Sequence, residues 1–214
     1  MANVSIWLFL LILLIGIWTA VTRELRLTIR GYILQTALVA ILYLLAAVRT
    51  GDPMIWAAFI GLSVIRIGFI PWLLKKVLPG DMMHQRDGNY AISPTYAIGL
   101  YILLAAVGIG IGHQLSPNLT NQLGLDFGLA LATLLVAIAA IAVNHHAPKQ
   151  IMSILSGDNA IDMIASMMLG QIAIIADYAI FIDVAIAIYI FSLLVLRLLA
   201  HGHSDVRKFN ELRG

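Results

Sequence analysis

Three aspartates lie inside apolar stretches of this chain, where a charged side chain is unexpected. Asp158 and Asp183 sit near the centres of two adjacent apolar runs, each long enough to cross a membrane, and Asp162 follows Asp158 by one helical turn. Lipid strongly disfavours a charge at that depth, so an intramembrane carboxylate indicates either a proton or ion path or a paired structural charge. The sequence therefore predicts that these acids carry whatever chemistry the protein performs.

Arg66 and Asn159 complete the candidate site. Arg66 lies inside another apolar run, and a helical rise of about 1.5 Å per residue places both Arg66 and Asp158 roughly 13 Å from the cytoplasmic edge. Asp162 and Asp183 share a level roughly 20 Å deep. We expect a stepping series of protonatable sites, with Asn159 holding a bridging water or joining two helices. The alternative is a fixed ion pair between Arg66 and Asp158, or an aspartate of another subunit, that never titrates.

Composition sets the class of protein. Of 214 residues, 61% are hydrophobic and 11% charged, whereas soluble domains carry about 25% charged residues. These values predict an integral membrane protein that contacts lipid and binds no nucleic acid. The absence of cysteine excludes disulfides and thiolate metal sites, and the sequence contains no HExxH motif, phosphate-binding glycine loop or serine elbow. We therefore expect no catalytic residue, no metal and no cofactor in this chain.

The predicted fold is all-α, a polytopic bundle of about seven transmembrane helices. Lys and Arg cluster in alternate connections and in the tail, which predicts an external N-terminus and a cytoplasmic C-terminus. Gly108 and Gly112, four residues apart, predict close helix packing, and Pro71 predicts a bend one turn beyond Arg66. The expected spans are 4–22, 31–49, 54–74, 93–112, 125–143, 150–170 and 173–199.

The C-terminal part of the chain resembles the K subunit of respiratory complex I and the C subunit of Mrp-type cation/proton antiporters. The similarity consists of a short cationic turn containing Lys149, a helix with the acid–amide pair Asp158-Asn159, a second helix with the central acid Asp183, and a polar tail. In the K subunit the two central acids are glutamates in the proton path. Asp183 falls at the second of these positions, and Asp158 is offset by about half a turn from the first.

Over its full length the chain resembles the hydrogenase-4 component E family. That family has about four helices before the K-like unit and an embedded cation followed five residues later by proline, as Arg66 and Pro71 are here. The resemblance divides the chain into a four-helix membrane segment at 1–124, a K-subunit-like three-helix unit at 125–203 and a cytoplasmic tail at 204–214.

This resemblance implies an accessory subunit of a complex I-like respiratory hydrogenase of the NiFe type, located in the bacterial cytoplasmic (inner) membrane. Its implied partners are antiporter-like and H-subunit-like membrane subunits and the iron–sulfur and hydrogenase subunits of the same complex. Its implied role is to contribute acids to a proton-translocation path and to help assemble the membrane arm. Two alternatives remain: a C-like subunit of a multisubunit monovalent cation/proton antiporter, and a purely structural scaffold.

Overall fold

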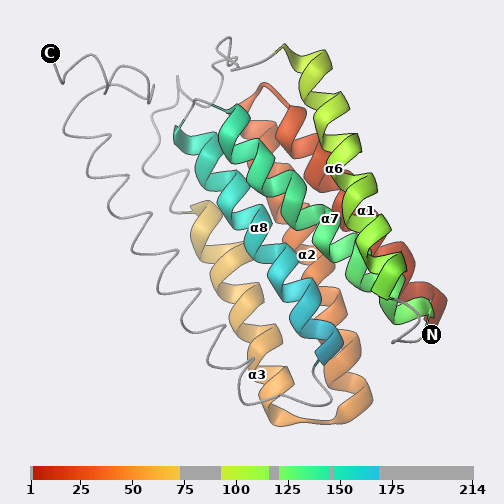
Figure 1. Ribbon diagram of the computed structural model, residues 1–214. Helices are drawn as coiled ribbons and strands as arrows, with labels where there is room; N and C mark the ends of the chain where they lie inside the picture. The colour runs from red at the N-terminus through yellow and green to blue at the C-terminus, as the bar shows by residue number, and fades with distance from the viewer. Residues whose placement is uncertain (1, 73–92, 116–120, 145–146, 169–214) are drawn as a thin grey trace, which may run out of the picture.

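The computed structural model describes residues 2–72, 93–115, 121–144 and 147–168, and these residues are helical except for short connections (Figure 1). No strand occurs among them, so the predicted all-α class is confirmed for this part of the chain. The helical elements are α1 (Ala2–Val21), α2 (Leu25–Thr50), α3 (Pro53–Leu62), the π-helix η1 (Ser63–Phe69), α6 (Pro94–Leu115), α7 (Asn121–Val143) and α8 (Ala147–Met168).

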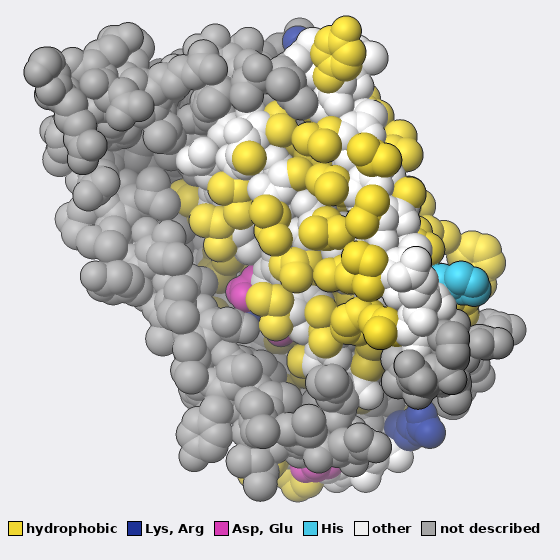
Figure 2. All heavy atoms as spheres, viewed as in Figure 1, with side chains coloured by type: hydrophobic (Ala, Val, Ile, Leu, Met, Phe, Trp, Pro, Cys, Tyr) yellow, Lys and Arg dark blue, Asp and Glu magenta, His cyan; other side chains and the backbone are white. Residues whose placement is uncertain are grey.

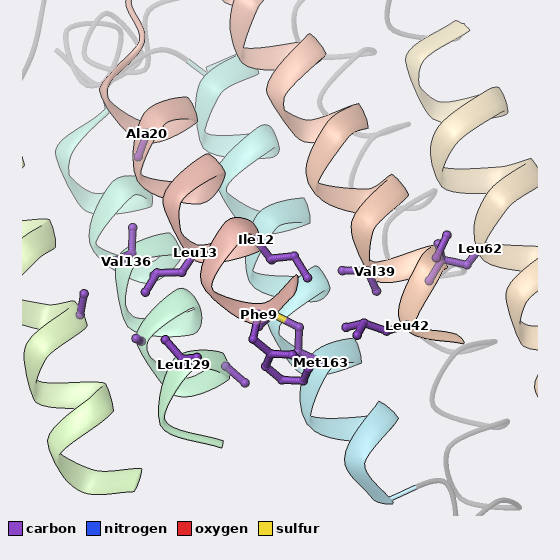
Figure 3. Close-up of a cluster of buried hydrophobic side chains, with 14 of the residues drawn as sticks. Phe9, Ile12, Leu13, Ala20, Val39, Leu42, Leu62, Leu129, Val136 and Met163 are labelled. Carbon is purple, nitrogen blue, oxygen red and sulfur yellow. The ribbon is translucent and has the colours of Figure 1, made fainter. Parts of the chain in front are cut away.

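The helices pack side by side in one bundle (Figure 1). Helix α2 packs against α1, α3, η1 and α8, while α7 packs against α1, α6 and α8. Between them, α2 and α7 contact all of the other described elements, and the segment that carries Arg66 packs against α2. Side chains from α1, α2, α7 and α8 point into a shared apolar interior, where Phe9, Ile12 and Met163 are almost fully buried (Figure 3).

Four described helices are long and apolar enough to cross a membrane: Leu25–Thr50, Pro53–Trp72, Pro94–Leu115 and Gln122–Val143. A shorter apolar helix covers Ser5–Val21, and α8 carries charged residues along its length. Six of the seven expected spans thus coincide with described helices. The seventh, 173–199, lies outside the described residues together with the tail at 204–214.

The outer surface of the bundle is apolar. Hydrophobic side chains cover most of the described surface that Figure 2 shows. All four tryptophans of the chain are exposed and lie near helix ends: Trp7 and Trp56 toward one end of the bundle, Trp18 and Trp72 toward the other. Tryptophan is enriched where a membrane meets water, because its ring is apolar and its N–H is polar. This arrangement is the one expected of helices that face lipid.

The turn between α2 and α3 follows from three consecutive residues. Gly51 ends α2 with φ of 68°, in the left-handed region that glycine adopts without a steric penalty. The Asp52 side chain then accepts a hydrogen bond from the Met54 N–H at 2.9 Å, and Pro53 occupies the first turn of α3, where no amide hydrogen is needed. This turn sends α3 back along the bundle and so determines where Arg66 lies.

Small residues bring α6 and α7 into close contact, as the spacing of Gly108 and Gly112 predicted. A Cβ atom added at Gly108 would lie 2.5 Å from the Ala132 backbone nitrogen. One added at Gly112 would overlap the backbone of Gly124 and Gly128. Without a hydrophobic driving force between helices in lipid, close backbone approach supplies the packing contacts that hold such a pair together.

Candidate functional site

Arg66 binds both aspartates of α8 inside the bundle. Its Nη2 atom lies 2.9 Å from Asp158 Oδ2, and its Nη1 atom lies 2.5 Å from Asp162 Oδ2. The Arg66 and Asp162 side chains are each 3% exposed, whereas that of Asp158 is 14% exposed. The three side chains of the cluster are therefore buried, and Asp158 is the most exposed of them.

Two local features of the sequence produce this geometry. The spacing of four residues places Asp158 and Asp162 on one face of α8, so that one guanidinium reaches both carboxylates. Arg66 lies at the middle of η1, where the Ile70 N–H bonds to the Ile65 carbonyl, five residues back. Pro71 follows this π-helical segment and supplies no amide hydrogen. Arg66 thus lies in a wider helical turn, a feature that often occurs at functional sites, and the bend at Pro71 stays a prediction.

Asn159 connects the charge cluster to α2. Its Oδ1 atom lies 3.5 Å from Arg66 Nη1, and its Nδ2 donates to Thr36 Oγ1 at 3.0 Å and to Gln35 Oε1 at 3.3 Å. Gln35 Nε2 in turn donates to the Ile12 carbonyl on α1 at 3.4 Å. Asn159, Gln35 and Thr36 are each 0% exposed. A fully buried polar network therefore joins α1, α2 and α8 to the arginine.

Four of the five predicted site residues come together: Arg66, Asp158, Asp162 and Asn159. The fifth, Asp183, lies outside the described residues. The alternative interpretation of the sequence was a fixed ion pair between Arg66 and Asp158. This pair is present, and Asp162 binds the same arginine. Whether these acids exchange protons stays a prediction.

Sequence reasoning missed the α2 side of the site. Gln35 and Thr36 are polar residues near the middle of an apolar run, which is the same signal that identified the aspartates. Lys149, which the sequence places in a cationic turn, lies in the first turn of α8 and is only 3% exposed. Nothing in the sequence distinguishes a lysine at the lipid surface from one that neighbouring helices cover.

A further buried acid lies apart from the cluster, on α7. Asp126 is 7% exposed, and its Oδ2 accepts a hydrogen bond from Ser5 Oγ on α1 at 3.1 Å. Its Oδ1 has no hydrogen-bond partner within the described part of the chain. No group of three or more His, Cys, Asp or Glu side chains that could hold a metal occurs among the described residues.

The apolar exterior, the four span-length helices and the buried charge cluster indicate a helical membrane protein. The chain is 28% identical over 196 residues to the uncharacterized protein Rv0085 of Mycobacterium tuberculosis, a match that covers 89% of this chain and 87% of the relative. No family model matches the chain, and no solved structure matches it.

Proposed function

We propose that this chain is a membrane accessory subunit of a complex I-like respiratory hydrogenase and that its buried charge cluster is a station in a proton-translocation path. The observation that carries the proton role is the sharing of one guanidinium by two carboxylates, Asp158 and Asp162. The assignment to a hydrogenase rests on the sequence resemblance described above.

Because Arg66 has two carboxylate partners, protonating one of them costs little free energy. If Arg66 had a single carboxylate partner, protonating that partner would leave a buried cation uncompensated, at a cost of about 3–5 kcal/mol. With two partners, one carboxylate takes the proton while the other stays paired with Arg66. Asp158 is the better acceptor because its side chain is 14% exposed against 3% for Asp162. Asp183 is the next station in this proposal.

The experiment measures proton translocation by the assembled complex in sealed vesicles. Asp158→Asn should abolish or strongly reduce proton movement while the subunit still assembles, because Asp162 keeps Arg66 paired. The matched control is Asp52→Asn, which removes a carboxylate at an exposed turn between α2 and α3. Unchanged translocation in Asp158→Asn, Asp162→Asn and Asp183→Asn would overturn the proposal.

A scaffold role is the second candidate, and the same ion pairs favour it because they join η1 to α8. Under this hypothesis the single Asn variants translocate normally, and only removal of both Asp158 and Asp162 impairs assembly. Purification in mild detergent identifies the partners: hydrogenase and iron–sulfur subunits support the respiratory complex, whereas antiporter subunits without a redox partner support the antiporter alternative.

A further inference from the structure

A small polar cavity lies between α1, α2, α7 and α8. Its volume is about 10 Å³, which is close to the space that one water molecule requires. The rest of its lining is alanine, glycine and methionine, and its polar lining comes from Thr19, Thr28, Tyr32, Asn144, Lys149, Ser153 and Ser156. The cavity is thus both large enough and polar enough to hold a water.

Two buried polar atoms in the cavity wall lack a hydrogen-bond partner among the described residues. They are Tyr32 Oη and Asn144 Oδ1, on residues that are each 1% exposed. Thr36, one turn from Tyr32, donates its hydroxyl hydrogen to Asn159 at 3.3 Å. A buried polar group without a partner is costly, and an internal water that satisfies such groups is a normal part of protein structure.

A buried lysine of α8 and a tyrosine of α2 both line the cavity. Lys149, Ser153 and Ser156 lie on one face of α8, at spacings of four and three residues, and all three line the cavity. Tyr32 lines the cavity from α2, one helical turn before Thr36, whose hydroxyl exchanges hydrogen bonds with the Asn159 amide of the charge cluster. The cavity wall therefore contains an ammonium group, which can release a proton, and a tyrosine one turn from the hydrogen-bonded network that holds Arg66.

We infer that this cavity holds a structural water and that Lys149, the water and Tyr32 form an entrance for protons to the Arg66 cluster. In one passage an N–H bond of the Lys149 ammonium breaks and its proton moves to the water. The water gives a different proton toward the Tyr32 hydroxyl, which passes its own toward Asp158. The lysine becomes a neutral amine, the carboxylate becomes an acid, and the water and tyrosine are regenerated. The proton role rests on the proposed function, whereas the presence of the water does not.

Hydroxyl-radical footprinting of the purified, assembled complex tests for the water, because radiolysis labels side chains beside internal waters. Tyr32 and Met152, which line the cavity, should be labelled. Tyr43 and Met163 are the matched controls, since both are 0% exposed and neither lines the cavity. Ser156→Leu should fill the cavity and eliminate the labelling of Tyr32. Equal labelling of Tyr32 and Tyr43 in the wild-type protein would overturn the inference.

Proton translocation in vesicles tests the relay. Tyr32→Phe should slow translocation without lowering the amount of assembled subunit, and Tyr43→Phe should leave the rate unchanged. If Tyr32→Phe translocates at the normal rate while Asp158→Asn does not, the entrance is wrong and the proposed function stands. If the aspartate variants also translocate normally, the proposed function and the relay both fail, and footprinting still decides whether the water is there.

Discussion

The Nη2 atom of Arg66 lies 2.9 Å from the Oδ2 atom of Asp158, inside a bundle whose outer surface is apolar. This contact joins the π-helical segment that precedes Pro71 to the middle of α8. Asp162 meets the same guanidinium one turn farther along α8. The arrangement makes the two acids redundant as partners of the arginine, and this redundancy leads to the first prediction.

Removing both acids should destabilise the protein far more than removing either one. Asp158→Asn or Asp162→Asn alone leaves Arg66 with a carboxylate, whereas the double variant leaves a buried cation unpaired and should cost about 3–5 kcal/mol. Adding Arg66→Met to the double variant should restore most of the lost stability. The measurement is the free energy of unfolding in mixed micelles. A double variant as stable as the single variants would show that Arg66 does not depend on these acids.

Replacing Asn159 should weaken the contact between α2 and α8. Asn159→Leu keeps a similar volume but removes the partner of Gln35 Oε1 and Thr36 Oγ1, which are buried, so we expect a loss of about 1–3 kcal/mol. The control is Thr50→Val, because the Thr50 hydroxyl bonds the Ala46 carbonyl at an exposed position. Its effect should stay within about 0.5 kcal/mol. Equal effects of the two substitutions would contradict the role assigned to Asn159.

A methyl group at Gly108 should separate α6 from α7. Gly108→Ala places a Cβ atom 2.5 Å from the Ala132 backbone nitrogen, and backbone cannot move aside as a flexible side chain can. Overpacking of this kind costs about 1–3 kcal/mol. Gly110→Ala is the control on the same helix, since nothing lies within 4 Å of its added Cβ. Thermal unfolding in detergent should distinguish the two variants, and a similar melting temperature for both would argue against close packing.

Alanine should have opposite effects on stability at Gly51 and at Gly61. Gly51→Ala forces a side chain into the left-handed conformation at φ of 68° and should destabilise the protein by about 1 kcal/mol. Gly61 lies inside the continuous helix Pro53–Trp72, with nothing within 4 Å of an added Cβ, so Gly61→Ala should stabilise the protein by about 0.5–1 kcal/mol. Unfolding free energies of the two variants test the difference in sign, which a destabilised Gly61→Ala would contradict.

The sequence predicted the described helices correctly where neighbouring residues alone determine the structure. Six expected spans coincide with described helices, and four of these are long and apolar enough to cross a membrane. The shared face of Asp158 and Asp162 followed from helical spacing alone. The close packing at Gly108 and Gly112 followed from their small side chains at a spacing of four.

The sequence alone could not predict which side chains contact one another between helices. Helices α1 and α2 show almost no preferred apolar face, so their sequences do not show which face turns inward. Burial of Lys149 by neighbouring helices had no local signal, and Gln35 and Thr36 acquired a role only when α2 met α8.

The sequence by itself determined that this chain forms apolar helices and carries acids where lipid would penalise them, since both properties depend on residue type and spacing along one helix. The tertiary structure decided that Arg66 stands between Asp158 and Asp162, with Asn159 linking it to α2. Arg66 lies 93 residues from Asn159 and 96 from Asp162 in the chain. A contact over that separation depends on how helices rotate and pack, and only the folded bundle specifies it.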